Sequence, residues 1–230
     1  MEVRTLPPGE RRLMLSLGLE RARAGGHELL CLGAHSDDLE IGCGGTLLRL
    51  LAEERIARVT WVVFSGNAER AKEARRAARQ LLGRRSGVRL VQHAFRDGFF
   101  PYQAVPIKEA FEQLKREVSP DLVLTHYRED RHQDHRLISD LTYNTFRDHL
   151  ILEYEIFKTD GDLGRPNVYV PLSAATVKRK LSLLERCFGS QRDRRWFSED
   201  VFRALLRLRG VEGGASEGFA EAFHGRKLVI

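Results

Sequence analysis

The sequence predicts an α/β fold in which a mainly parallel sheet is covered by helices on both faces. Short apolar runs alternate with helical patterns along the first two thirds of the chain, and this order is typical of strands joined by helical crossovers. The first run, residues 28–34, is apolar and ends in a turn-rich segment, which indicates a buried strand. Buried strands are expected where helices cover both sides of a sheet.

Four strands and four helices are expected between residues 28 and 150. The strands are the short apolar runs at residues 28–34, 58–64, 88–93 and 121–125. The helices are the patterned stretches at residues 47–54, 69–82, 106–118 and about 134–150. Gly83 suits a left-handed cap after the second helix, and Pro106 is compatible with the first turn of the third. Residues 42–45, with three glycines, are expected to turn the backbone tightly into the first helix.

The last third of the chain is less regular. Strands are predicted at residues 152–157 and 167–170, and helices at 174–187 and 198–209. A glycine-rich loop at 210–218 follows, and a final strand is predicted near 226–230. No repeat or Pro/Ser-rich linker divides the 230 residues, of which 42% are hydrophobic. The chain, residues 1–230, is therefore expected to form a single domain whose C-terminal third, from about residue 151, is irregular.

The basic composition is interpreted as a property of the surface. The net charge is +6, with nine basic residues between positions 70 and 96 and seven between 178 and 195. Residues 121–162 instead carry ten acids against five bases. Nucleic acid is not expected as a partner, although clustered basic residues can gain affinity for phosphates by releasing counterions.

The sequence favours a cytoplasmic protein. No apolar run approaches the ~18 residues of a membrane-spanning helix, and the first 28 residues hold five arginines without a typical secretory signal. Cys31, Cys43 and Cys187 show no CxxC spacing, so they are expected to be reduced thiols. A metal ion would have to be held by histidines and carboxylates.

Two segments concentrate ionisable side chains directly after predicted strands. The first reads Gly-Ala-His-Ser-Asp-Asp from residue 33, and the second reads Asp-Arg-His-Gln-Asp-His from residue 130. Open α/β sheets place their ligands at the carboxyl ends of strands. A lone histidine or aspartate pair is more often a structural residue or a helix cap. Together, however, the two segments provide enough ligands for a metal ion and a base.

These residue types favour a zinc hydrolase site. Catalytic zinc usually takes three histidine or carboxylate ligands and a water, whose pKa falls to about 7. His35, Asp38 and His135 can supply such a set. Asp37 then keeps a free carboxylate that could take a proton from the water.

Two further residues of the second segment have candidate roles. His132 lies one helical turn before His135 and, when protonated, could donate to an oxyanion. Asp134 is suited to fix the orientation of an imidazole ring or to raise its basicity.

The paired motifs resemble those of the LmbE-like or PIG-L family of zinc-dependent N-deacetylases. The first is His35-Ser-Asp-Asp38 with the continuation Glu40-Ile-Gly-Cys-Gly-Gly45, and the second is His132-Gln-Asp-His135. The resemblance extends to Tyr154-Glu-Ile156 and Ala220-Glu-Ala-Phe223. It implies a Rossmann-like three-layer sandwich with one zinc ion per chain. Ser36 and Gln133 replace the family's usual prolines without removing a ligand.

The family's roles fall on the residues selected from their chemistry. The resemblance implies that His35, Asp38 and His135 bind zinc, that Asp37 is the base and that His132 stabilises the tetrahedral intermediate. It further implies a small-molecule partner, an N-acetylated amino sugar of the N-acetylglucosamine type, from which the acetyl group is removed. The sequence leaves open whether Asp37 or His132 protonates the leaving amine. It also leaves open whether the protein forms a homo-oligomer.

Substrate contacts are predicted at four residues. Arg70 could meet an acidic aglycone, Phe99 could pack on a sugar ring, and Arg128 and Arg131 flank the second motif. Each also has a simpler interpretation, as a solvated helix residue, a core residue or an ion-pair partner. Two alternative functions are a zinc amidase acting on a non-sugar amide and a basic nucleic-acid-binding protein with a relic metal site.

Overall fold

The computed structural model describes residues 26–53, 55–83, 85 and 87–229. The N-terminal segment, interpreted above as lacking a secretory signal, lies mostly outside these residues. Within the described part of the chain, no helix is long and apolar enough to cross a membrane.

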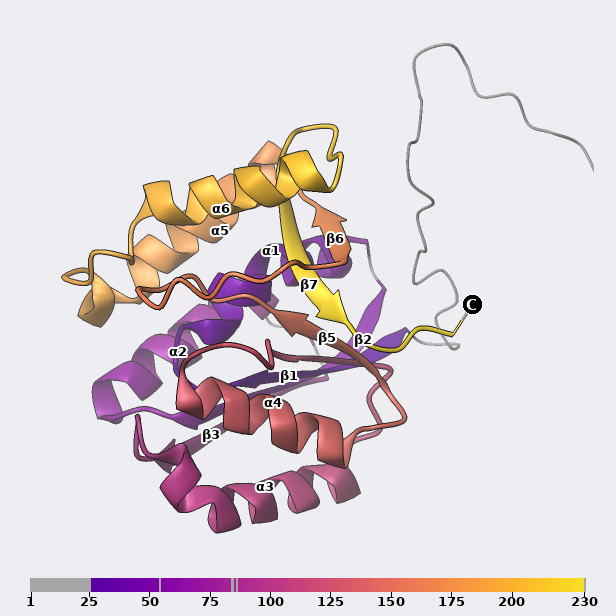
Figure 1. The fold of residues 1–230 in the computed structure, drawn as a ribbon, viewed down its shortest axis with the longest axis vertical. Helices are drawn as coiled ribbons and strands as arrows, with labels where there is room; N and C mark the ends of the chain where they lie inside the picture. Colours follow the sequence, from indigo (N-terminus) through magenta and orange to yellow (C-terminus); the bar gives the residue numbers. More distant parts are fainter. Residues whose placement is uncertain (1–25, 54, 84, 86, 230) are drawn as a thin grey trace, which may run out of the picture.

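A seven-stranded sheet forms the centre of the molecule (Figure 1). Its strands are β1 (His27–Gly33), β2 (Ile56–Ser65), β3 (Val88–Phe95), β4 (Leu122–His126), β5 (Leu150–Tyr154), β6 (Val168–Pro171) and β7 (Ala220–Gly225). They lie in the order β3-β2-β1-β4-β5-β7-β6. The first five strands are parallel, and β7 is antiparallel to both β5 and β6. The predicted α/β fold with a mainly parallel sheet is confirmed.

Helices cover both faces of the sheet. They are α1 (Asp38–Ala52), α2 (Ala68–Leu82), α3 (Ala104–Glu117), α4 (Gln133–Thr145), α5 (Ala174–Cys187) and α6 (Glu199–Glu212), with the short 3₁₀ helices η1 (Phe100–Gln103) and η2 (Gly189–Gln191). In Figure 1, α3 and α4 lie on one side and α1, α2, α5 and α6 on the other. Successive residues of β1 serve the two layers in turn, because side chains alternate along a strand. Leu29 and Cys31 join the α1 core, and Leu30 and Leu32 join the α3–α4 core.

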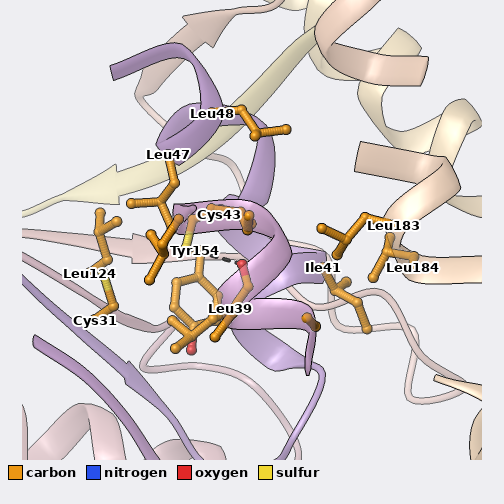
Figure 2. Close-up of a cluster of buried hydrophobic side chains, with 14 of the residues drawn as sticks. Cys31, Leu39, Ile41, Cys43, Leu47, Leu48, Leu124, Tyr154, Leu183 and Leu184 are labelled. Carbon is orange, nitrogen blue, oxygen red and sulfur yellow. Dashed lines mark hydrogen bonds between the residues drawn. The ribbon is translucent and has the colours of Figure 1, made fainter. Parts of the chain in front are cut away.

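Helix α1 begins nine residues before the predicted helix, and the expected glycine turn at 42–45 is wrong. These residues are helical, and at Gly42 and Gly45 the helix packs too closely on its neighbours for a larger side chain. A Cβ atom at Gly42 would lie 2.2 Å from the Tyr154 ring, and one at Gly45 would lie 2.5 Å from Leu172. Figure 2 shows Tyr154 among the side chains of Leu39, Cys43 and Leu47 under this helix. The glycines therefore permit close packing rather than a turn.

Other boundaries also differ from the predicted ones. Helix α4 ends at Thr145, since the chain enters β5 at Leu150 rather than at 152. Helix α6 continues to Glu212 through Gly210, where a Cβ atom would lie 2.2 Å from the Gly218 carbonyl oxygen. The last strand is Ala220–Gly225 and not 226–230, because only that earlier segment pairs with both β5 and β6.

The close packing at Gly42 predicts a contrast between two substitutions in one helix. Gly42→Ala should lower the free energy of unfolding by about 1–3 kcal/mol, because the methyl group overpacks against the buried Tyr154. Gly44→Ala is the matched control: its Cβ atom would meet Leu81 at an ordinary 3.5 Å, so the helix-forming alanine should be neutral or stabilising by up to about 1 kcal/mol. Urea unfolding of the two variants measures the difference. Equal effects would contradict the packing explanation.

His224 in β7 predicts a pH dependence of stability. Its ring stacks on Tyr127 with 3.7 Å between centroids, and burial, then the charge of Arg209, lowers the pKa of His224 to about 4. The folded-state pKa lies below the ordinary value of 6.5, so the unfolded chain binds the proton first as pH falls. The stability that this preference for the neutral ring contributes is complete above pH 6.5 and is lost between pH 6.5 and 4.

His224→Phe keeps an aromatic ring on Tyr127 but removes the titration. Between pH 7 and pH 4.5, the variant should therefore lose about 2 kcal/mol less unfolding free energy than the unmodified chain. Urea unfolding at both pH values measures the two losses. Identical losses would show that His224 does not titrate as described.

Candidate metal centre

Both sequence motifs lie at the carboxyl ends of the central strands β1 and β4. The sheet order changes direction between these two strands, because the chain runs from β1 outward to β2 and β3 and then returns to β4. Such a switch point is where doubly wound sheets bind ligands. The motif residues meet there, although about a hundred positions separate them in the sequence.

The first motif forms the turn from β1 into α1. The amide of Ala34 donates to Nε2 of His126 at 2.9 Å, and the amide of His35 donates to Oδ2 of Asp38 at 2.6 Å. Asp37 occupies the N-cap position of α1 but makes no cap hydrogen bond with its side chain. Its carboxylate is thus directed elsewhere, although an aspartate at this position usually caps the helix.

The second motif forms the start of α4. His132 is the N-cap, and its Nδ1 atom accepts a hydrogen bond from the Asp134 amide at 3.3 Å. The His132 amide donates to Oδ1 of Asp130 at 2.7 Å. His135 lies in the first turn, 2% exposed, and points back toward the first motif.

Three side chains that can bind a metal ion, those of His35, Asp38 and His135, converge where the motifs meet; they are called the donor set below. His35 Nδ1 lies 3.0 Å from His135 Nε2 and 3.4 Å from Asp38 Oδ2, and His135 Nε2 lies 3.6 Å from Asp38 Oδ1. Ligand atoms each about 2.1 Å from a tetrahedral zinc ion are about 3.4 Å apart. The donor types and their separations therefore fit a divalent metal ion of the zinc kind.

His126 is a further candidate ligand that the sequence analysis did not identify. It is fully buried at the end of β4, its Nε2 atom lies 3.1 Å from Asp38 Oδ2, and its ring stacks on that of His135 at 3.9 Å. Three further groups in the described residues could hold a metal ion: Asp38, His126 and His135; His35, His132 and His135; and His35, Asp97, His132 and Asp134. The signal in the sequence was its place directly after the predicted strand 121–125, at the strand end where ligands are expected.

Carboxylates hold the outer nitrogen atoms of the two histidines. Asp130 Oδ2 lies 2.9 Å from Nδ1 of His135, and its other oxygen lies 2.8 Å from the ammonium of Lys158. Asp134 Oδ2 lies 3.3 Å from Nε2 of His35. The orienting carboxylate of His135 is thus Asp130, whereas Asp134, predicted for an orienting role, faces His35. Hydrogen bonds of this kind fix ring orientation and tautomer in metal sites.

Asp134 also shapes the rim of the site. Its two oxygens accept hydrogen bonds from the amides of Gly98 at 2.6 Å and Phe100 at 3.1 Å. The loop after β3 is therefore held against α4. This loop carries Asp97, whose Oδ1 atom lies 3.1 Å from Nε2 of His35.

The electrostatics of the site favour, for Asp38 and His135, the protonation states that metal ligands need. Burial raises the pKa of Asp38, but His135, His126 and His35 together hold it well below its usual range. Burial and then His126 lower the pKa of His135 to about 3. A charged carboxylate and a neutral imidazole are the forms that bind a metal ion.

His35 shows that the site attracts positive charge. Burial alone lowers its pKa, but Asp38, Asp134 and Asp97 outweigh burial and raise it well above its usual value. The carboxylates thus stabilise a cation at the position where the three donors meet.

Asp37 and Arg70 form an ion pair at the edge of the donor set. Arg70 Nη2 lies 2.9 Å from Asp37 Oδ1, and Nη1 lies 3.1 Å from Asp97 Oδ2. Asp37 is 3% exposed, and its Oδ2 atom makes no hydrogen bond within the described residues. Burial raises the pKa of Asp37, Arg70 opposes this and Asp38 adds to it.

The other predicted substrate contacts lie farther out. Phe99 is 38% exposed on the loop after β3, with the Arg96 guanidinium 3.7 Å above its ring. The Arg131 amide donates to Asp162 at 2.7 Å, and its side chain is exposed beside the second motif. Arg128 reaches Asp140, 3.5 Å away, so the structure does not bring it to the donor set.

The fold and this site define an α/β protein with a histidine–aspartate centre suited to a divalent metal ion. The sequence profile of PIG-L, GlcNAc-PI de-N-acetylase, matches residues 30–146, which is just over half of the chain. The chain belongs to the PIG-L family.

Comparison with known proteins finds relatives by sequence and by fold. The uncharacterized deacetylase YaiS of Escherichia coli (strain K12) is 34% identical in an alignment of 118 positions that covers 46% of this chain. The match spans only 61% of that protein's length.

Solved structures that share the fold include a deacetylase and a hydratase. N,N'-diacetylchitobiose deacetylase from Pyrococcus horikoshii superposes with a TM-score of 0.67 at 20% identity, over 88% of this chain and 85% of that one. GalB, the 4-carboxy-2-hydroxymuconate hydratase from Pseudomonas putida KT2440, superposes with a TM-score of 0.70 at 18% identity, over 89% and 98%. The same fold therefore serves a deacetylase and a hydratase.

Proposed function

We propose that this chain is a zinc-dependent hydrolase that removes the acetyl group from an N-acetylated amino sugar, a conjugate of the N-acetylglucosamine type. The observation that carries the proposal is the convergence of His35, Asp38 and His135 beside a buried carboxylate oxygen of Asp37 that has no described partner. Membership of the PIG-L family and the similarity to YaiS support the same reaction.

We assign the metal to His35, Asp38 and His135, with one ion per chain. When bound there, a zinc ion supplies Lewis-acid polarisation of the amide carbonyl and lowers the pKa of an attacking water. Asp130 and Asp134 keep the two imidazole rings turned toward the ion through the hydrogen bonds described above.

Asp37 is the proposed general base. Its Oδ1 atom is held by Arg70, so its Oδ2 atom is available to take the proton from the water as it attacks the carbonyl carbon. Burial, which raises its pKa, makes it a stronger base than an exposed aspartate. We propose that the same carboxyl then passes the proton to the amine as the C–N bond breaks.

His132 is the proposed oxyanion donor. Because its Nδ1 atom accepts the Asp134 amide hydrogen, the ring proton of a neutral His132 lies on Nε2. That N–H group can donate to the carbonyl oxygen as negative charge develops on it. No protonated imidazolium is needed for this role, in contrast to the form considered from the sequence.

The rim residues suggest how a sugar conjugate would bind. Arg70 lies in the site and Arg131 beside it, so an anionic aglycone group would meet positive charge there. Phe99 offers a half-exposed ring for the apolar face of a sugar. Arg128, which reaches Asp140, is the weakest of the predicted contacts.

We further propose that residues 1–230 form one domain. The proposal is supported by the sheet, because β7, far beyond the family match, pairs with β5.

A hydratase is the second candidate function, because GalB shares the fold. A zinc amidase acting on a non-sugar amide is a nearer alternative.

The deciding experiment incubates the zinc-loaded, full-length protein with N-acetylglucosamine conjugates that bear lipid, nucleotide, inositol or carboxylate aglycones, and measures acetate and free amine. Equal amounts of acetate and amine support the proposal. No acetate from any conjugate, with water addition to an unsaturated carboxylate instead, would favour the hydratase.

Asp37→Ala should abolish turnover while zinc stays bound. Loss of a general base costs about 10²–10⁴-fold in kcat, and Asp37 is outside the assigned ligand set. Acetate release gives kcat, and atomic absorption gives the zinc content. Asp38→Ala is the control, since it should lose the metal. Loss of zinc from Asp37→Ala would make Asp37 a ligand instead.

His132→Asn separates the catalytic role of His132 from its role as N-cap. Asparagine still caps the helix, so this variant should lower kcat by about 10²–10³-fold with little change in stability. His132→Ala should have the same low kcat and also lose about 1 kcal/mol of unfolding free energy. Steady-state kinetics and thermal unfolding test both. An unchanged kcat in His132→Asn would remove the ring from catalysis.

A further inference from the structure

A buried ion pair outside the family-matched segment contacts the helix that carries Asp37 and Asp38. Glu221 lies on β7 and Lys180 on α5, their charged atoms are 2.6 Å apart, and both side chains are 3–4% exposed. Both residues lie beyond residue 146, where the family match ends.

The pair bonds to backbone groups in the middle of α1. The amides of Gly45 and Thr46 donate to the two oxygens of Glu221 at 2.7 and 2.6 Å, and the Lys180 ammonium donates to the carbonyl of Ile41 at 2.5 Å. In a regular helix these amides donate to carbonyls four residues earlier, so Gly45 would pair with Ile41.

The charges match those that stabilise helix ends. An anion is favourable at free helix amides and a cation at free helix carbonyls. Glu221 therefore contacts the amides of Gly45 and Thr46 as an anion contacts the start of a helix. Lys180 contacts the carbonyl of Ile41 as a cation contacts the end of a helix. Both contacts lie in the middle of α1. Side chains inserted into the helical ladder can bend or divide helices, and this pair contacts α1 directly after its first turns, from Asp38 to Ile41.

Gly45 makes this arrangement sterically possible. A Cβ atom there would lie 2.9 Å from Oε1 of Glu221. The link to the catalytic end is short, because the amide of Ile41, whose carbonyl Lys180 holds, donates to the carbonyl of Asp37 at 3.0 Å.

Stability alone is a poor reason for such a pair. Removing two charges from water costs about as much as their attraction returns, and apolar replacements are often as stable. A second buried ion pair joins Glu155 and Arg209, whose charged atoms are 2.7 Å apart. Both ion pairs line one small cavity of about 20 Å³. The second pair contacts Glu212 and the Gly164 carbonyl instead of α1, so it provides an internal comparison.

We propose that Glu221 and Lys180 are positioning residues that orient the first turns of α1, and with them Asp37 and Asp38, for metal binding and proton transfer. The inference rests on the proposed function of these two aspartates. Neither Glu221 nor Lys180 touches the substrate or the reacting atoms.

The test measures cobalt binding to the metal-free full-length protein. Glu221→Gln and Lys180→Met should weaken Co²⁺ binding by about 10–100-fold, the usual effect of losing an outer-layer contact at a metal site, and should change the visible ligand-field spectrum. The matched controls Glu155→Gln and Arg209→Met should lower the thermal midpoint but change Co²⁺ affinity less than about twofold, with an unaltered spectrum. Lys180→Arg, which keeps the charge, should restore most of the affinity.

All measurements are made well below the thermal midpoint of each variant. If Glu221→Gln keeps normal affinity and spectrum, or if the two pairs weaken binding equally, the positioning role is overturned. Glu221→Gln is nearly isosteric and decides the question even if Lys180→Met does not fold. Absence of acetate release from the unmodified protein would count against the proposed function alone, because cobalt binding does not depend on the substrate.

Discussion

The contact between Tyr154 and helix α1 links the core to the candidate metal centre. The buried ring fits against Gly42, where any side chain would collide with it. Its hydroxyl donates to the Leu32 carbonyl at 2.7 Å and lies 3.2 Å from Nε2 of His126. The same nitrogen atom is 3.1 Å from Asp38. One aromatic side chain of β5 thus sets the height of α1 above the sheet and contacts the histidine beside the ligand set.

The site concentrates carboxylates in a chain whose surface is basic. Asp37, Asp38, Asp130 and Asp134 are all at most 3% exposed, and burial of so many acids is favourable only when cations or donors compensate them. Lys158 lies 2.8 Å from Asp130, and backbone amides donate to Asp134. At the centre, the compensating charge is held by His35, at the position where a divalent ion would be bound. The net charge of +6 says little about this local excess of acids.

The part of the chain beyond residue 146 contributes to the site without supplying the predicted ligands. Lys158 neutralises the carboxylate that holds His135 and also binds Asp162 at 2.6 Å. Asp162 in turn accepts the amide of Arg131 at 2.7 Å, which ties this loop to the second motif. Glu221 and Lys180 hold α1 from the other side. A deacetylase and a hydratase share this fold, so differences of chemistry must arise in such surroundings and in the rim loops rather than in the sheet.

The sequence by itself determined the order of strands and helices and the two motifs at the strand ends, because hydrophobic periodicity and motif spacing are local properties. It misplaced the start of α1, since three glycines usually favour a turn, whereas Gly42 and Gly45 instead allow the helix to pack closely against Tyr154 and Leu172. It did not single out His126, and it placed Asp130 in the second segment without identifying it as the carboxylate that holds His135. Nor could it pair Glu221 with Lys180, 41 positions away. Such contacts depend on which side chains the folded sheet brings within a few ångströms of each other, and sequence spacing carries no information about that distance.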